Sequence, residues 1–379
     1  MRTAMSDLLD FDVPFFAFSH CRDVVAAVTN AGGVGVLGAV AHTAEDLEID
    51  MKWVENEIGP GATYGVDLLM PSKFTGAKQG GLSREELRAQ IPEEHRAFMD
   101  GLLDRYGIPP LLDVPREQRV KRAGLQVDPK SMTPLLDIAF AHDIKVIVSG
   151  LGSPPAEVIE RAHAAGVVVG AQAGTVEHAR RHKEAGVDFV IAQGTEAGGH
   201  TGDITTMVLV PQVVDAVAPL PVLAAGGIAN GRQVAASLAL GAAGVWCGSV
   251  WLGTEEGEST PAERERFIAA RSQDTTRSRS FTGKPCRVLK SAWTEAWEQE
   301  DAPQPLPMPL QSMLVDRSRR RVQRVAHKKD SRAPELLSPF IGQIVGQITS
   351  IKPTRRVMTE MMEEMAEAIA RLDDIMSED

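Results

Sequence analysis

The chain has 379 residues, of which 43% are hydrophobic, and its formal net charge is −11. This length is sufficient for one large domain with an accessory part. The negative charge argues against general affinity for nucleic acid or for an anionic membrane surface. The N-terminus does not resemble a signal peptide, and no stretch reaches the roughly 18 apolar residues that a membrane span needs. We therefore expect a cytoplasmic protein.

The cysteines agree with this expectation. There are three of them, Cys21, Cys247 and Cys286, and they lie far apart in the sequence. Neither a CxxC pair nor a Cys/His spacing typical of metal sites occurs. The sequence predicts reduced thiols and no metal ion.

One unit recurs along the chain: an alanine-rich helical pattern, a glycine that ends it, and a short apolar run. Copies lie at residues 21–40, 155–173, 175–194 and 231–250. Glycine adopts the left-handed conformation that ends many helices. The apolar runs show little polar alternation, which indicates parallel strands covered by helices on both sides.

Counting such runs gives eight expected strands, near residues 13–19, 34–40, 62–70, 144–150, 167–172, 189–194, 221–226 and 244–250. Eight parallel strands alternating with helices predict an α/β fold of the closed (β/α)8 type, the TIM barrel, with its active site at the C-terminal strand ends. A doubly wound open sheet is the alternative.

Two regions interrupt the pattern. Residues 71–130 are polar and rich in Pro and Gly, and they form an excursion after the third strand. Residues 253–379 no longer alternate, and we expect a mostly helical cap over the barrel mouth, with residues 1–252 as the barrel. Within the cap, the basic patch 317–332 is either a solvated face or an anion site for a bulky acidic substrate.

The run GVGVLG at residues 33–38 matches the G-x-G-x-x-G dinucleotide fingerprint. That fingerprint must follow a strand and open a helix. Here a helical pattern precedes it and the run itself reads as a strand. We interpret its first glycine as a helix stop.

The segment AAGGIANGR, residues 224–232, is better placed to hold a phosphate, because it follows a strand and precedes a helix. Glycine lets backbone N–H groups approach an anion, and the helix N-terminus adds partial positive charge. Barrels commonly bind phosphate after strands seven and eight. The predicted anion pocket consists of Gly226, Gly227, Gly248 and Ser249; tight turns without a ligand are the alternative.

The segment QGTEAGGH, residues 193–200, follows the sixth strand. Gln193 can hydrogen-bond a ring carbonyl or nitrogen, and Gly198 and Gly199 let the chain lie flat against a planar ligand. His200 can act as a general base or donor near neutral pH, so it is the candidate catalytic and substrate-binding residue. The candidate carboxylates to orient it are Glu196 and Asp203.

The end of the first strand, FAFSHCRD, supplies candidates that shape the mouth: Ala17, Phe18 and His20, the last as a substrate contact. Cys21 could be a nucleophile with His20 as its base. Adjacent residues on a strand end usually point in opposite directions, which argues against that pair.

These motifs resemble the nitronate monooxygenases, formerly called 2-nitropropane dioxygenases, which are FMN-dependent enzymes on a TIM barrel. The resemblance covers roughly residues 13–70 and 131–290. Its most specific part is VDFVIAQGTEAGGHTG followed by PVLAAGGIANGRQVAASLALGAAGVWCGS. It implies that His200 is the catalytic base or a substrate contact and that Gln193 contacts the flavin.

The resemblance also implies that the FMN phosphate lies at the two glycine turns, on Gly226, Gly227, Gly248 and Ser249. Asp67 stands on the third strand where many members have Asn, and we assign it to the cofactor site as well. The chain departs from the family at the first strand, where FFAFSHCRD replaces a Gln-Ala-Pro-Met segment.

The leading hypothesis is an FMN-dependent oxidoreductase that oxidises alkyl nitronates, and nitroalkanes, with dioxygen. The alternative is an FMN-dependent NAD(P)H reductase acting on an enoyl thioester or a quinone. A third hypothesis is a flavin-binding protein without catalysis, whose cap docks a partner. The final helix, with Met, Ile and Leu among acids, leaves open a homodimer face or a cap on the barrel.

Overall fold

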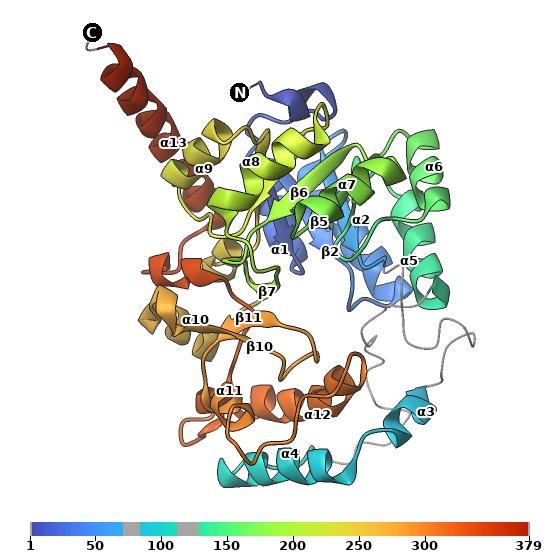
Figure 1. The fold of residues 1–379 in the computed structure, drawn as a ribbon, viewed down its shortest axis with the longest axis vertical. Coiled ribbons are helices and arrows are strands. Elements are labelled where there is room, and N and C mark those ends of the chain that lie inside the picture. The colour runs from blue at the N-terminus through green and yellow to red at the C-terminus, as the bar shows by residue number, and fades with distance from the viewer. Residues whose placement is uncertain (1, 71–83, 112–128, 378–379) are drawn as a thin grey trace.

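The computed structural model describes residues 2–70, 84–111 and 129–377 (Figure 1). Eight parallel strands close into a barrel in the order β1-β2-β3-β4-β5-β6-β8-β9. The predicted closed barrel is therefore confirmed, and the open sheet is excluded. The strands are β1 (Phe15–Ser19), β2 (Val34–Gly38), β3 (Tyr64–Leu68), β4 (Val146–Ser149), β5 (Val168–Ala173), β6 (Phe189–Gln193), β8 (Val222–Ala225) and β9 (Gly244–Cys247).

Side chains alternate between the barrel interior and the surrounding helices, as the pleat of a strand requires. The interior is packed by one apolar cluster that includes Phe16, Val36, Val148, Phe189 and Trp246. Their sequence neighbours, such as Phe15 and Leu37, belong to a second cluster that joins the strands to the helices. The interior is thus a packed core, and a ligand has access only at a strand end.

Helices cover the outside of the barrel, and several begin at side-chain caps. Thr43, Thr175 and Asn230 each accept a hydrogen bond from the third helical backbone N–H, which satisfies an otherwise unpaired donor. The helices are α1 (Arg22–Asn30), α2 (Ala44–Ile58), α5 (Pro129–Ala141), α6 (Ala156–Ala164), α7 (Val176–Ala185), α8 (Thr206–Val217) and α9 (Gly231–Ala239).

A second lobe lies below the barrel in Figure 1 and joins the excursion to the C-terminal region. Its core includes Leu103 from the excursion and Trp293 and Val322 from the C-terminal region. Its helices are α3 (Arg84–Ala89), α4 (Glu93–Arg105), α10 (Pro261–Ala269), α11 (Ala292–Trp297) and α12 (Leu310–Val325). The remainder of the excursion, residues 71–83 and 112–128, lies outside the described residues.

The lobe also contains a small antiparallel sheet that the sequence did not predict. Its order is β10-β11-β7, with β10 at Thr275–Ser278, β11 at Cys286–Leu289 and β7 at Gly199–His200. The strand β7 belongs to the loop after β6, so this sheet attaches the lobe to the barrel mouth.

The basic patch 317–332 is not simply a solvated face. Arg321 is 9% exposed and donates hydrogen bonds to the carbonyl oxygens of Ile108 and Pro109. The guanidinium of Arg319 lies 5.3 Å from the ring centroids of both Phe281 and Phe340. These arginines hold the lobe together, which corrects the expectation for this part of the patch.

The final helix, α13 (Thr354–Ser377), does not cover the mouth. It packs along α9 and also contacts α1 on the outer wall of the barrel. Gly231 permits this packing, because a Cβ atom there would lie 2.2 Å from the backbone of Met361. The end of α13 extends beyond the barrel (Figure 1). Among the described residues, no helix is both long and apolar enough to cross a membrane.

Candidate active site

The predicted site residues lie at or beyond the C-terminal ends of β1, β3, β6, β8 and β9. Register places Asp67 opposite Gly38 and Val148, and Val148 packs inside the barrel, so Asp67 also faces inward. Phe18 packs against the interior cluster as well. The side chain of Ala17 lies in the outer cluster, so only its backbone can face a ligand in the mouth.

The glycine turn after β8 has a backbone that only glycine adopts readily. Gly226 has φ 95° and Gly227 has φ 74°, both in the left-handed region. A Cβ atom on Gly226 would lie 2.8 Å from the carbonyl oxygen of Gly194. The hydroxyl of Thr206 donates to the Gly226 carbonyl oxygen over 2.8 Å. The turn is thus held closely against the loop that follows β6.

The turn after β9 is linked to the same loop through Gly342. The Oγ atom of Ser249 accepts a hydrogen bond of 2.8 Å from the backbone N–H of Gly342. A Cβ atom on Gly342 would lie 2.6 Å from the carbonyl oxygen of Glu196, and one on Gly198 would lie 2.8 Å from the Gly342 nitrogen. The turn after β8 therefore borders residues 194–198 directly, and the turn after β9 is linked to them through Gly342, which is a further rim residue.

The N-terminus of α9 is occupied by the protein's own acceptors. The side-chain oxygen of Gln233 accepts from the backbone N–H groups of Ala229 and Asn230. Glu364 of α13 accepts from the N–H of Gly231 over 3.0 Å. The backbone N–H groups of Ala229, Asn230 and Gly231 therefore already have acceptors, and the one on Gly231 is a carboxylate. An anion would have to use the two glycine turns.

His200 lies on β7 opposite Cys286, and its Nε2 atom is 2.9 Å from Oγ1 of Thr282. The single hydroxyl proton of Thr282 is directed to the carbonyl oxygen of Lys284, 3.1 Å away. His200 Nε2 therefore donates to Thr282, and Nδ1 is the unprotonated nitrogen.

The electrostatic surroundings of His200 favour its neutral form. His200 as a whole residue is exposed, but nearby protein atoms partly desolvate its ring. This desolvation lowers the pKa of His200, and the positive charge of Lys284 lowers it further. Such an imidazole can accept a proton near neutral pH.

Neither carboxylate suggested as an orienting group contacts His200. Both oxygens of Glu196 accept from the backbone N–H of Thr206, at 3.0 and 3.1 Å, at the start of α8. Asp203 forms an ion pair with Arg277 instead. Thr282 is the partner that orients His200, and the sequence carried no local signal for it, because it lies 82 residues away.

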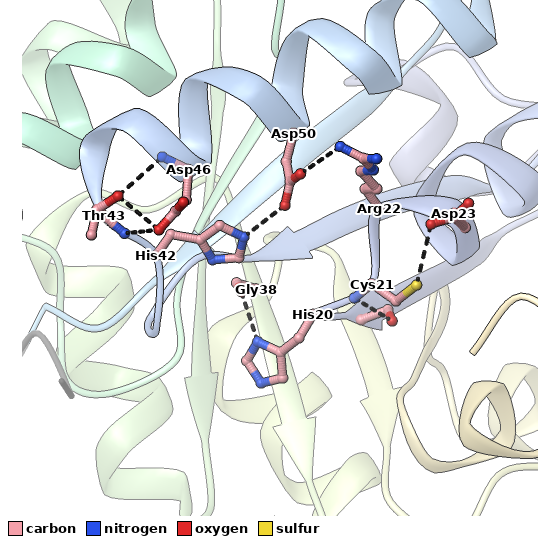
Figure 2. A network of polar contacts seen from close by, with 10 residues as sticks. His20, Cys21, Arg22, Asp23, Gly38, His42, Thr43, Asp46 and Asp50 are labelled. Atoms are coloured by element: carbon pink, nitrogen blue, oxygen red, sulfur yellow. Dashed lines mark hydrogen bonds and ion pairs between the residues drawn. The ribbon is translucent and has the colours of Figure 1, made fainter. Parts of the chain in front are cut away.

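Figure 2 shows the rim formed by the ends of β1 and β2. The Nδ1 atom of His20 donates to the carbonyl oxygen of Gly38 over 2.7 Å, so Nε2 is the acceptor nitrogen. Burial lowers the pKa of His20, which keeps the ring neutral. The ring of Phe18 meets that of His20 edge-on at 5.1 Å.

Cys21 is not arranged as a nucleophile. Its thiol donates to the carbonyl oxygen of Glu256 over 3.0 Å, and its side chain turns away from His20 (Figure 2). Burial raises the pKa of Cys21 to about 11, so the thiolate is scarce at neutral pH.

Asp67 is the unusual titratable group of the site. It is 4% exposed, and its Oδ2 atom is buried without a hydrogen-bond partner among the described residues. Burial raises the pKa of Asp67 well above its ordinary range. An unsatisfied carboxyl that faces the barrel interior near the end of β3 suits a site that holds a polar ligand group.

A closed parallel barrel with glycine turns and an imidazole at its strand ends places the chain among the (β/α)8-barrel enzymes. The chain belongs to the nitronate monooxygenase family, whose model, described as "Nitronate monooxygenase", matches residues 18–364. It is therefore an oxidoreductase of that family, whose members are typically flavin-dependent.

Individual relatives cover nearly the whole chain. A Mycobacterium tuberculosis protein named "Putative monooxygenase Rv1533" is 55% identical over 375 residues, which is 99% of each chain. A "Probable nitronate monooxygenase" of Staphylococcus haemolyticus is 31% identical and covers 83% of this chain and 84% of its own. The crystal structure of nitroalkane oxidase from Streptomyces ansochromogenes superposes with a TM-score of 0.77 at 27% identity, covering 98% of this chain and 100% of that chain.

Proposed function

We propose that the protein is an FMN-dependent enzyme that oxidises alkyl nitronates, and neutral nitroalkanes, with dioxygen. The observation that carries this proposal is the position of His200. Its neutral imidazole follows the loop that borders the turn after β8 and is linked through Gly342 to the turn after β9. A base and a phosphate cradle thus share one loop at the mouth of the barrel.

The residues present fit FMN. The backbone N–H groups of Gly227, Gly248 and Ser249 would hold its phosphate, because these turns present backbone without large side chains. Gln193 and Asp67 would meet the polar edge of the ring from inside the barrel. When bound, the flavin would supply the acceptor for the electrons that leave the substrate.

His200 would perform the proton chemistry. A neutral nitroalkane must lose a proton from the carbon that bears the nitro group before it becomes a nitronate. The Nδ1 atom of His200 would take that proton, while Nε2–H stays bonded to Thr282 and fixes the tautomer. If the substrate is already a nitronate, the His200 ring, once protonated, would donate a hydrogen bond to that anion.

The rim around this base supports a small substrate. His20 and Phe18 form one wall of the mouth at the end of β1. The opposite wall is β7 and the lobe attached to it through β11. We propose that these two walls admit a small organic substrate and dioxygen.

The test is anaerobic reduction of the FMN-loaded protein, followed by its visible absorbance. Four reductants are compared: an alkyl nitronate, a neutral nitroalkane, NADH and NADPH. The proposal expects bleaching by the nitronate and the nitroalkane and little by the nicotinamides. Bleaching only by NADH or NADPH would instead identify a reductase of an unsaturated thioester or a quinone. No bleaching by any of them would point to a flavin-binding protein without this catalysis.

A further inference from the structure

Asp67 is a buried carboxyl whose Oδ2 atom has no hydrogen-bond partner among the residues that the structure describes. It faces the barrel interior near the end of β3, and it is 4% exposed. No hydrogen bond or ion pair of its side chain with another described residue is recorded, and its Oδ2 atom is unsatisfied. An ionised carboxylate in such surroundings is costly, whereas a protonated carboxyl loses far less on burial.

The neighbours of Asp67 leave its carboxyl facing the mouth of the barrel. At the same level, the adjacent strand β2 contributes Gly38 and β4 contributes the apolar Val148. One step further out, Gly150 follows β4, and a Cβ atom there would lie 2.9 Å from Oδ1 of Asp67. Among these neighbouring positions of β2, β3 and β4, Asp67 therefore has the polar side chain.

The titratable groups described on the adjoining elements have other partners than Asp67. His20, beyond β1, is bonded to the Gly38 carbonyl oxygen, and its pKa is lowered by burial. His42, beyond β2, faces Asp50, which also pairs with Arg22. Burial is the cause that raises the pKa of Asp67, so the uncharged acid persists well above the ordinary range for aspartate.

We propose that Asp67 is kept as an uncharged carboxylic acid and donates a hydrogen bond to an acceptor on the flavin ring. The inference rests on the proposed binding of FMN. That ring carries carbonyl oxygens and unprotonated nitrogens, to which a carboxylic acid can donate and which a carboxylate would repel. Loss of the proton at alkaline pH would therefore replace a hydrogen bond with a repulsion and weaken FMN binding.

The first measurement is the dissociation constant of FMN for the full-length protein, from flavin fluorescence between about pH 7 and pH 9, above the second ionisation of a phosphate monoester at about pH 6. The wild type should bind about tenfold or more weakly at the alkaline end. The variant Asp67→Asn keeps an N–H donor and cannot ionise, so its affinity should not vary with pH. The variant Asp67→Ala should bind more weakly at neutral pH, also without pH dependence. Asp137→Asn, which changes a carboxylate on the outer helix α5, should follow the wild type.

The second measurement does not need the flavin. The infrared difference spectrum between wild type and Asp67→Asn at neutral pH should contain the carbonyl band of a protonated carboxyl. That band should disappear as pH rises in the same range in which FMN affinity falls.

Absence of the band at neutral pH would overturn the proposal, and so would equal pH profiles of FMN binding in wild type and Asp67→Asn. Failure of every variant and the wild type to bind FMN would overturn the flavin assignment and this role together. A persisting carboxyl band would then show that the acid itself is protonated and that the flavin assignment was the error.

Discussion

The Nε2 atom of His200 lies 2.9 Å from Oγ1 of Thr282, although 82 residues separate the two along the chain. The contact joins the loop after β6 to the turn between β10 and β11, so the barrel supplies the base and the second lobe supplies its orienting partner. The position of the proton on His200 therefore depends on the lobe being docked.

Replacing Thr282 with Val should impair the base without unfolding the protein. The valine is similar in shape but cannot accept from Nε2–H, so the tautomer with an unprotonated Nδ1 is no longer favoured. A neutral hydrogen bond contributes about 0.5–1.5 kcal/mol, which corresponds to a loss of roughly two- to tenfold in kcat/KM for a neutral nitroalkane. Thr282→Ser keeps the hydroxyl and is the matched control. Equal kcat/KM values for the Val and Ser variants would contradict the orienting role.

Arg321 should be a determinant of lobe stability. It donates to the carbonyl oxygens of Ile108 and Pro109 and lies 3.2 Å from a carboxylate oxygen of Asp100. Arg321→Met would leave the buried carbonyl oxygen of Ile108 unpaired, which costs about 1–3 kcal/mol in the free energy of unfolding measured in urea.

The control for this prediction is Arg320→Met on the same helix. Arg320 pairs with Asp316 on an exposed face, and such pairs contribute little, so its variant should lie within about 0.5 kcal/mol of the wild type. If Arg320→Met destabilised the protein as much as Arg321→Met, the buried contacts would not be what matters.

The cysteines should resist alkylation while the protein is folded. Burial raises the pKa of Cys21 and Cys286 to about 11 and that of Cys247 to about 12, so thiolates are scarce at neutral pH. Iodoacetamide at neutral pH should label none of them until urea unfolds the chain, as read by intact mass. Cys21→Ser should retain turnover. Rapid labelling of Cys21 in the folded protein, or loss of turnover in Cys21→Ser, would restore its candidacy as a nucleophile.

The barrel could be predicted from sequence because each of its strands is a local signal. Gly186 ends the helix before the run FVIAQ, and that run, like VLAA in β8, is apolar and packs on both faces. The order of these strands around the barrel then follows from their order in the chain. The glycine turns at Gly226 and Gly227 were found for the same reason, since their positive φ angles are a property of a few adjacent residues.

The contacts of the C-terminal region could not be predicted in this way. Glu364 accepts from Gly231 across 133 residues, and Gly342 donates to Ser249 across 93 residues. The sequence around Glu364 or Gly342 contains no local pattern that predicts such a distant partner. The same holds for β7, which consists of two residues and exists because β11 pairs with it.

The orienting carboxylates failed for a related reason. Glu196 and Asp203 lie close to His200 in sequence, but each binds another group. Glu196 accepts from Thr206, the first residue of α8, and Asp203 forms an ion pair with Arg277. Proximity within a loop determines which carboxylates can reach a histidine. Whether they bind it depends on the other hydrogen-bond donors that compete for them.

The most direct test of the account is His200→Asn, with flavin reduction by a neutral nitroalkane measured anaerobically beside reduction by its preformed nitronate. The wild-type rate with the nitroalkane should fall only below about pH 6.5, because the pKa of His200 is lowered and the base must be unprotonated. The variant should bind FMN as the wild type does, reduce it at least about 100-fold more slowly with the nitroalkane, and keep the nitronate reaction within about tenfold. An unchanged rate with the nitroalkane would contradict the assignment of His200 as the base.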